Sequence, residues 1–242
     1  MTDAARLRAR LSGLSLGVFA ADHGRLREWA EQAASWGAAA LHFDVMDGVF
    51  VPAITGGPAF VAALDVGLPR DVHLMVETPS RQVAAFAEAG ADVITVHAEA
   101  RDAAEAIAGV RAASDKLGRP ILAGLALMPD TGIDAAAALL ALAPDLVLVL
   151  AVDPRRKTAP AIEPAVAKLA ALRMRQPGNR PLFAFDGGVA LTTINAVAAG
   201  YPDLVVSGSA VFAAPDPEVA FARLAAAFGV TATSVAATGT GR

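Results

Sequence analysis

The chain has 242 residues and a formal net charge of −4; 55% of its residues are hydrophobic and 18% are charged. Such a composition excludes a disordered chain, and the length suffices for one large domain or two small ones with a sizeable core. The acidic balance disfavours nucleic acid as a main partner, and the lack of Cys excludes disulfides, thiolate metal sites and a cysteine nucleophile.

The N-terminal segment admits two interpretations. Three arginines within residues 6–10 precede an apolar stretch at 11–21, an order that superficially resembles a secretory signal peptide. Asp3 interrupts the basic part, however, and Gly and Ser dilute the apolar part, so we interpret residues 14–20 as a first buried strand. The whole chain lacks a run of about 18 apolar residues, so we expect no membrane span.

Eight short apolar runs recur along the chain. They favour Val, Leu, Ile and Phe without regular polar alternation, as strands buried on both faces do. The expected strands are residues 14–20, 40–45, 71–76, 92–97, 121–126, 145–150, 182–185 and 203–207. Ala-rich stretches with helical spacing separate them, at residues 26–36, 81–89, 103–117, 135–143, 164–175, 192–199 and 217–228.

Glycine or proline stands at several helix-to-strand joints, as at Gly37 and Gly90, where it suits a left-handed helix end. Eight strand–helix units in this length predict an α/β fold, the (β/α)8 or TIM barrel. The main alternative is a doubly wound open sheet, but no Gly-rich dinucleotide turn follows the first strand. We expect residues 1–228 to form a single domain and residues 229–242 to be a flexible tail.

Polar residues late in the strands are the candidates for chemistry, because barrel sites lie at the C-terminal strand ends. His42 and Asp44 are two residues apart and leave the same face of their strand. His73 lies inside the next strand, and Asp186 ends the seventh. Two imidazoles and two carboxylates suit one borderline divalent ion such as Zn, Mn, Fe or Co.

Taken singly, each of these residues is better explained without a ligand, since a lone strand His is more often a core residue and an Asp before Gly-Gly a turn former. The chain has only four His, and the joint placement of two of them favours a metal site. We expect His97 to support a ligand or line the pocket wall. Met46 and Met75 are candidates for the pocket wall, although ordinary apolar packing explains them as well.

The loops after the seventh and eighth strands predict an anion site. Barrels often hold phosphate there through backbone N–H groups. The loops contain Gly187, Gly188, Gly208 and Ser209, where Gly permits close backbone approach and Ser adds a hydroxyl. The three lysines all fall outside the expected strands, which disfavours a Schiff-base aldolase.

These residues, in this order, resemble the ribulose-phosphate 3-epimerase family from about residue 14 to residue 213. The resemblance is carried by the phrases Ala21-Asp22, His42-Phe43-Asp44-Val45-Met46-Asp47-Gly48, Phe50-Val51-Pro52, Asp71-Val72-His73-Leu74-Met75, Ala89-Gly90-Ala91-Asp92, Thr95-Val96-His97-Ala98-Glu99, Asp186-Gly187-Gly188 and Ser207-Gly208-Ser209-Ala210-Val211-Phe212. It implies a barrel of the ribulose-phosphate-binding type that inverts the hydroxyl at C3 of a ketose phosphate.

Carried over residue by residue, the resemblance implies that His42, Asp44, His73 and Asp186 hold the metal and that Asp44 and Asp186 form the acid/base pair. This role is chemically coherent. Removal of the C3 proton beside the C2 carbonyl yields an enediolate, whose charge a divalent ion stabilises. One carboxylate takes the proton on one face and the other delivers a proton to the opposite face.

The substrate-binding positions depart from the family pattern. The serine that touches substrate in the family is replaced by Gly17, and the family's Asn-Pro after the fifth strand becomes Met128-Pro129. The family's glycine-rich closing loop is replaced by Asp153-Pro154-Arg155-Arg156-Lys157-Thr158. Arg155 is a candidate for a phosphate contact, with a solvated basic turn as the alternative.

The leading hypothesis is a metal-dependent ketose-phosphate 3-epimerase, with D-ribulose 5-phosphate to D-xylulose 5-phosphate as the default reaction. The alternatives are an epimerase for another ketose phosphate and a non-catalytic barrel that binds a sugar phosphate. We expect a small-molecule ketose phosphate as the partner, neither nucleic acid nor membrane, a homo-oligomer and a cytoplasmic location.

Overall fold

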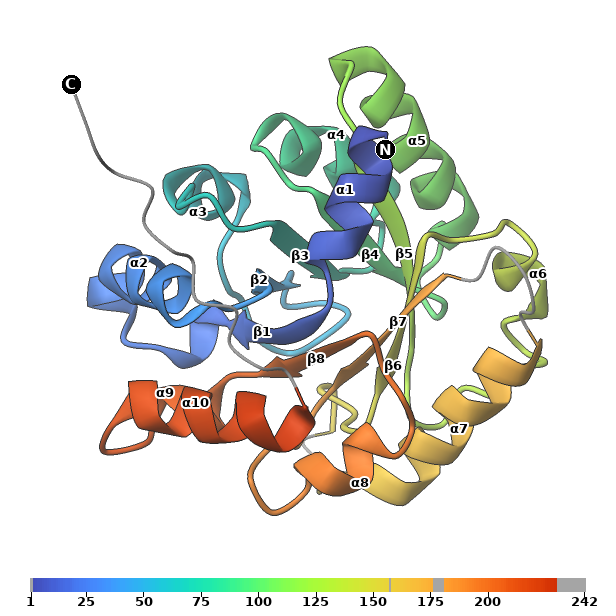
Figure 1. The fold of residues 1–242 in the computed structure, drawn as a ribbon. Coiled ribbons are helices and arrows are strands. Elements are labelled where there is room, and N and C mark those ends of the chain that lie inside the picture. The colour runs from blue at the N-terminus through green and yellow to red at the C-terminus, as the bar shows by residue number, and fades with distance from the viewer. Residues whose placement is uncertain (1, 157, 176–180, 230–242) are drawn as a thin grey trace.

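Eight parallel strands close into a barrel in the computed structural model, which describes residues 2–156, 158–175 and 181–229 (Figure 1). The strands follow chain order around the barrel, and the last pairs with the first. They are β1 Gly13–Gly17, β2 Ala40–Met46, β3 Arg70–Met75, β4 Val93–His97, β5 Leu122–Leu127, β6 Leu146–Leu150, β7 Leu182–Asp186 and β8 Leu204–Ser207. The predicted (β/α)8 barrel is confirmed, and the open sheet is excluded.

Helices surround the barrel (Figure 1). They are α2 Leu26–Trp36, α3 Pro58–Ala63, α4 Ser80–Glu88, α5 Ala103–Leu117, α6 Ala137–Leu140, α7 Ile162–Arg175, α8 Ile194–Ala198, α9 Ser209–Phe212 and α10 Pro217–Phe228. The bounds predicted for α2, α5 and α10 agree with the structure, whereas the short helices α3 and α9 were not predicted. Within the described ranges, every helix is too short or too polar to cross a membrane.

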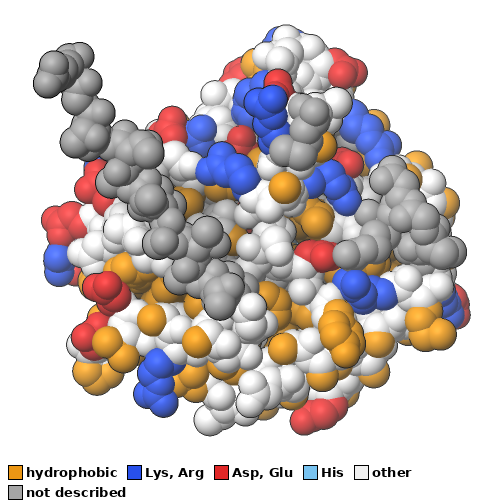
Figure 2. Space-filling model, in the orientation of Figure 1, with side chains coloured by type: hydrophobic (Ala, Val, Ile, Leu, Met, Phe, Trp, Pro, Cys, Tyr) orange, Lys and Arg blue, Asp and Glu red, His pale blue; other side chains and the backbone are white. Residues whose placement is uncertain are grey.

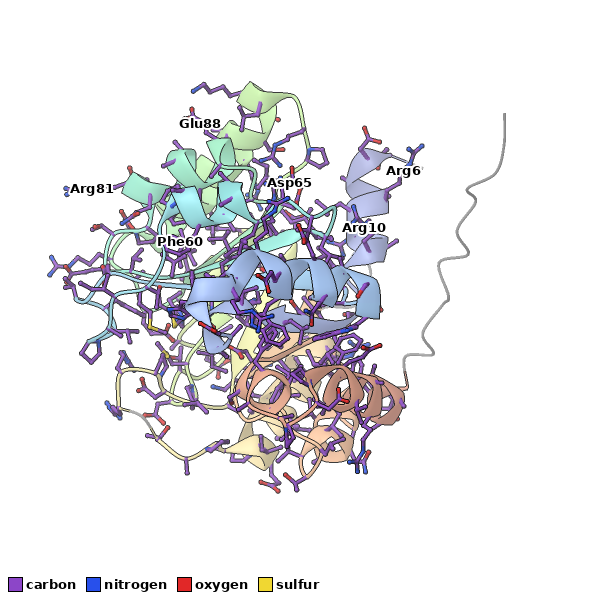
Figure 3. All side chains as sticks on the ribbon, turned by 90° about the vertical axis from the view of Figure 1, so that its left-hand side faces the viewer. Arg6, Arg10, Phe60, Asp65, Arg81 and Glu88 are labelled. Carbon is purple, nitrogen blue, oxygen red and sulfur yellow. The ribbon has the colours of Figure 1, made fainter. Side chains whose placement is uncertain are left out.

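An additional helix, α1 Asp3–Arg10, closes the N-terminal end of the barrel. The side chain of Thr2 caps it, and Leu7 and Leu11 pack with the side chains inside the barrel. Arg6 and Arg10 lie on α1 at this end of the molecule (Figure 3). Basic and acidic side chains are interspersed on the face shown in Figure 2. The segment that superficially resembled a signal peptide therefore supplies a helix and the buried strand β1.

The predicted first strand is shorter than expected. β1 ends at Gly17, and residues Val18–Ala20 form a 3₁₀ turn, η1; a second, η2, spans His23–Arg25. Phe19 and Ala20 line the cavity described below, so the chain leaves the barrel wall where the cavity begins.

The buried apolar side chains form two clusters. The larger lies between the strands and the surrounding helices, and the smaller fills the barrel interior with side chains such as Leu146, Leu148 and Ala184. The buried polar residues that point into the interior lie on the neighbouring strands β1 to β4: Ser15, His42, Asp71, His73, Thr95 and His97. One side of the barrel is therefore polar where the other is packed with Leu and Ala.

The last described helix ends next to the predicted domain boundary at residue 228, which stays a prediction. α10 ends at Phe228, and Gly229 follows it with a left-handed backbone (φ 87°). The rest of the predicted flexible tail, residues 230–242, lies outside the described residues.

Candidate active site

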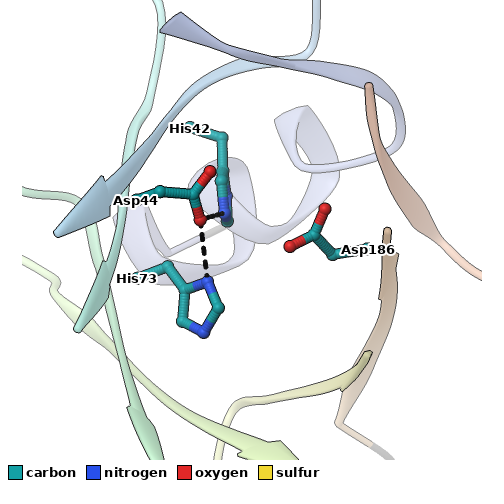
Figure 4. Close-up of side chains that lie close together, drawn as sticks. All are labelled: His42, Asp44, His73 and Asp186. Carbon is teal, nitrogen blue, oxygen red and sulfur yellow. Dashed lines mark hydrogen bonds and ion pairs between the residues drawn. The ribbon is translucent and has the colours of Figure 1, made fainter. Parts of the chain in front are cut away.

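Four side chains from three strands meet at the C-terminal end of the barrel (Figure 4). β2 supplies His42 and Asp44, whose side chains leave the same face because alternate residues of a strand do so. The register of β2 and β3 sets His73 beside Asp44, and Asp186 ends β7. One ligand atom from each of the four residues lies within 4.8 Å of all the others. The predicted convergence is confirmed.

The two histidines each turn one ring nitrogen towards Asp44. Nδ1 of His42 lies 2.7 Å from Oδ2 of Asp71, and its Nε2 lies 3.3 Å from Oδ1 of Asp44. Nδ1 of His73 lies 3.1 Å from the same Asp44 oxygen. Since an ionised carboxylate only accepts hydrogen bonds, Nδ1 of His42 donates to Asp71. Nε2 of His42 is then the nitrogen that faces the site.

A divalent cation fits this arrangement. Nε2 of His42 is buried, and within the described part of the chain its one polar neighbour is Oδ1 of Asp44 at 3.3 Å, without the geometry of a hydrogen bond. A buried polar atom left in this way costs free energy unless a ligand engages it. Two imidazole nitrogens and two carboxylates match the donors that Zn, Mn, Fe and Co accept.

The charges around His42 point the same way. Burial lowers the pKa of His42, but the negative charges of Asp71 and Asp44 outweigh burial and raise the pKa well above 6.5. Burial also lowers the pKa of His73, and hydrogen bonding to Asp44 only partly opposes it. The surroundings of His42 thus attract positive charge, which is the requirement for holding a cation.

The two carboxyls have opposite proton affinities. Burial raises the pKa of Asp44, but the charge of His42 and the contacts with His42 and His73 outweigh burial and hold this pKa far below its usual range. Burial and the charge of Asp44 raise the pKa of Asp186 to about 6. One carboxyl is therefore firmly ionised while the other exchanges a proton near neutral pH, as expected of an acid/base pair.

A cavity of about 890 Å³ opens onto Asp44 and Asp186. The loops after β7 and β8 form another part of its wall and contribute Gly187, Gly188, Gly208 and Ser209. Gly188 has a left-handed backbone (φ 70°), and a Cβ there would lie 2.5 Å from Pro160. A Cβ on Gly208 would lie 2.9 Å from Ala20. Glycine therefore lets the backbone of both loops border the cavity closely.

The remaining candidates for the pocket wall divide into two groups. Met46 lines the cavity, together with Thr55, whose hydroxyl donates to the carbonyl of Asp44 and accepts from the N–H of Met46. Met75 is 2% exposed and is not among the residues that line the cavity. His97 is fully buried, and its Nε2 lies 2.8 Å from Nε2 of His73, one of the four candidate ligands.

Asp153 forms two ion pairs within the loop after β6, with Arg155 and with Arg156. The nearly buried carboxylate of Asp153 engages Arg155 through Nε at 2.9 Å and Nη2 at 2.8 Å. The same guanidinium lies over the ring of Phe50, 5.9 Å from its centre. Arg155 is outside the set of cavity-lining residues, Arg156 pairs with Asp130, and Lys157 lies outside the described residues.

Two carboxylates of the site were missed at the sequence level. Asp71 begins the third apolar run and reads as a strand boundary, but it shares a face with His73 and pairs in register with His42. Glu99 follows β4 and accepts a hydrogen bond from Nδ1 of His97 at 3.0 Å. The two-residue spacing of Asp71 and His73, and of His97 and Glu99, is the signal that would have indicated both.

Comparison of sequences identifies related proteins. A family model described as the ribulose-phosphate 3 epimerase family matches residues 14–212. Ribulose-phosphate 3-epimerase of Mycobacterium tuberculosis is 38% identical over 214 residues, covering 86% of this chain and 89% of that protein. The protein of the same name from Bacillus subtilis is 34% identical over 212 residues, covering 86% of this chain and 95% of that protein.

Comparison of structures supports the barrel. A 3-hexulose-6-phosphate synthase from Salmonella typhimurium superimposes with a TM-score of 0.68 at 18% identity, covering 89% of this chain and 98% of that one. KGPDC from Streptococcus mutans gives a TM-score of 0.68 at 15% identity, covering 90% of this chain and 98% of that one. At such identities the likeness concerns the fold alone.

Proposed function

The chain belongs to the ribulose-phosphate 3-epimerase family, and from this premise we propose that it inverts C3 of a ketose phosphate, with D-ribulose 5-phosphate to D-xylulose 5-phosphate as the default reaction. The chain is accordingly an isomerase of the epimerase type. The observation that carries the proposed reaction is the pair Asp44 and Asp186, which border one cavity with opposite shifts in pKa.

We propose that these two carboxyls move the proton. Asp44, which is ionised, takes the proton from C3 on one face of the substrate, and Asp186 in its protonated form delivers a proton to C3 from the other face. In the reverse direction the roles exchange. Closeness of the two groups matters, because in the ion-free chain the charge of Asp44 is one cause of the raised pKa of Asp186. A cation held by both carboxyls would lower the pKa of Asp186 from that value.

His42, Asp44, His73 and Asp186 would together hold one divalent ion, Zn, Mn, Fe or Co. Such an ion supplies positive charge beside the oxygens of the enediolate. Asp71 orients the ring of His42 by accepting from Nδ1, which directs Nε2 at the site.

Gly187, Gly188, Gly208 and Ser209 would bind the phosphate group. Their loops border the same cavity as Asp44 and Asp186, so a ligand that spans the cavity reaches both. Backbone N–H groups of glycine-rich turns suit phosphate oxygens, and the exposed Ser209 adds a hydroxyl. Met46 would contact the substrate from the cavity wall, and Met75 would act from behind it.

Exchange of deuterium from solvent into C3 of D-ribulose 5-phosphate tests the proposed reaction. We expect exchange and formation of xylulose 5-phosphate in the presence of Mn or Zn. Exchange with another ketose phosphate alone would favour an epimerase of different specificity. Absence of exchange with every ketose phosphate, despite bound metal, would leave the non-catalytic sugar-phosphate-binding barrel.

Restoring a hydroxyl at position 17 is expected to tighten substrate binding. A Cβ on Gly17 would lie 3.7 Å from Cα of Gly208 and 3.9 Å from Oδ2 of Asp44, so Ser fits without a clash. One added hydrogen bond contributes about 0.5–1.5 kcal/mol, so we expect Gly17→Ser to lower the KM for ribulose 5-phosphate about two- to tenfold. Gly17→Ala is the control, and equal KM values for the two variants would exclude a hydroxyl contact.

Arg155 as a phosphate contact stays a prediction, which replacement of Arg155 and Arg156 by Ala tests. Charge-assisted hydrogen bonds contribute about 1.5–3 kcal/mol, so contact with phosphate predicts a rise in KM of about tenfold or more. The pairing of Arg155 with Asp153 leaves part of its guanidinium for this role. An unchanged KM would assign the phosphate to the glycine loops alone.

A homo-oligomer and a cytoplasmic location also stay predictions.

A further inference from the structure

We infer that Glu99 sets the tautomer of His73 through His97, and that Glu99 is therefore a positioning residue for the metal site. The inference deepens the proposed function and rests on it, because the nitrogen concerned is the one that His73 would offer to the ion. Glu99 itself is outside the group of four candidate ligands.

A continuous chain of hydrogen bonds joins the three residues. Oε2 of Glu99 lies 3.0 Å from Nδ1 of His97, and Nε2 of His97 lies 2.8 Å from Nε2 of His73. Both rings are fully buried, with their centres 4.9 Å apart and an interplanar angle of 25°. Neither ring is therefore free to exchange these partners for water.

The direction of the hydrogen bonds follows from the chemistry of the end group. An ionised carboxylate only accepts, so Nδ1 of His97 carries the hydrogen. In a neutral imidazole the other nitrogen then has the lone pair, so Nε2 of His97 accepts from Nε2 of His73. Nδ1 of His73 then has the lone pair that a bound cation requires, and this nitrogen lies inside the cluster of candidate ligands. Without a cation, the ionised carboxylate of Asp44, 3.1 Å away, is a second acceptor that draws a hydrogen to Nδ1, so this tautomer belongs to the cation-loaded chain.

The two candidate histidine ligands are thus oriented by different routes. Asp71 accepts directly from Nδ1 of His42 and frees Nε2, whereas Glu99 acts on His73 through His97 and frees Nδ1. A carboxylate behind a ligating histidine fixes its tautomer and raises its basicity. Here the ring of His97 lies between the carboxylate of Glu99 and the candidate ligand His73.

The second oxygen of Glu99 explains why an amide would not substitute for the carboxylate. Oε1 accepts from the N–H of Met128 at 3.0 Å and from the hydroxyl of Thr131. In Glu99→Gln, a single amide oxygen faces both the N–H of Met128 and Nδ1 of His97. The backbone N–H of Met128 can only donate, whereas the tautomer of His97 can change, so the amide oxygen should turn to Met128 and its NH₂ group to His97. The hydrogens along the chain would then reverse and place one on Nδ1 of His73.

The experiment measures zinc affinity by competition with a chelator in the full-length chain. We expect Glu99→Gln to weaken zinc binding about 10- to 100-fold, as loss of outer partners of metal ligands does. Glu77→Gln is the matched control. Glu77 lies on the loop after β3, pairs with Arg101, and has no contact with the histidines. Equal affinities for Glu99→Gln, Glu77→Gln and the parent chain would overturn the inference.

Nitrogen NMR of the histidine rings gives a readout that loss of packing would not reproduce. In the zinc-loaded parent chain we expect a hydrogen on Nε2 of His73 and on Nδ1 of His97, and in zinc-free Glu99→Gln we expect hydrogens on Nδ1 of His73 and Nε2 of His97. A zinc-loaded parent chain without a hydrogen on Nδ1 of His97 would overturn the inference, even where the variant fails to fold. A parent chain that binds no zinc would instead contradict the metal part of the proposed function.

Discussion

Replacing Asp186 with Asn is expected to reduce turnover by at least about 10²–10⁴-fold, the contribution of a positioned acid or base. The amide keeps the shape of the carboxyl but can neither take nor deliver a proton at C3. Asp186 is the residue with the largest expected effect because it borders the cavity and its pKa of about 6 suits proton transfer at neutral pH.

Loss of activity in Asp186→Asn should occur without loss of stability. The pKa of Asp186 is raised in the folded chain from 3.8 to about 6, so the folded state binds the proton more tightly than the unfolded state. This group therefore makes the free energy of unfolding fall as pH rises from about 4 to about 6. Asn removes the charge that causes this fall, so the metal-free variant at pH 7 should have an equal or higher Tm.

The control for this prediction is Asp216→Asn. Asp216 accepts a hydrogen bond from the N–H of Val219 at the start of α10, and Asn caps a helix about equally well. We expect its turnover and Tm to match those of the parent chain. Retained turnover in Asp186→Asn, measured as deuterium exchange at C3, would contradict the role assigned to Asp186.

Removal of the divalent ion is expected to lower turnover about 100-fold or more, since an ion that stabilises a developing oxyanion contributes several kcal/mol. The physical reason lies in the local charge: Asp44 is ionised, and a substrate enediolate would add negative charge beside it. Dialysis against a chelator followed by addition of Zn, Mn, Fe or Co in turn measures both the loss and the recovery.

A second measurement of the metal is independent of activity. A ligand that binds only the folded chain raises its stability according to concentration and affinity, so the metal-loaded chain should have the higher Tm. His42→Ala should abolish this rise, because it removes the buried Nε2 that lacks a hydrogen-bond partner among the described residues. Full turnover in chain shown to contain no metal would refute the proposed metal centre.

The sequence predicted correctly those features that depend on the residues of a single strand or helix. The apolar runs predicted all eight strands to within a few residues, because strands buried on both faces require continuous apolar sequence. The two-residue spacing of His42 and Asp44 predicted a shared face, and His73 followed in the neighbouring strand. The short helices α3 and α9 were missed because so few residues carry no helical period.

The roles of the two carboxylates behind the histidines could not be predicted from the sequence, because they depend on contacts between different strands. Asp71 and Glu99 are single acidic residues at the ends of apolar runs, where a charged residue usually marks a boundary with solvent. Only the closed barrel sets Asp71 against His42 and places His97 between Glu99 and His73. The engagement of Arg155 by Asp153 likewise became visible only in the folded loop.

The amino-acid order by itself determined the barrel and the residues whose side chains point into its C-terminal end, because strand alternation and apolar burial are properties of neighbouring positions. The tertiary structure alone decided which nitrogen of each histidine faces the cluster and why Asp44 and Asp186 differ in pKa. Both outcomes depend on distances of a few ångströms between strands that are far apart in the chain, and electrostatic and hydrogen-bond energies vary steeply over such distances.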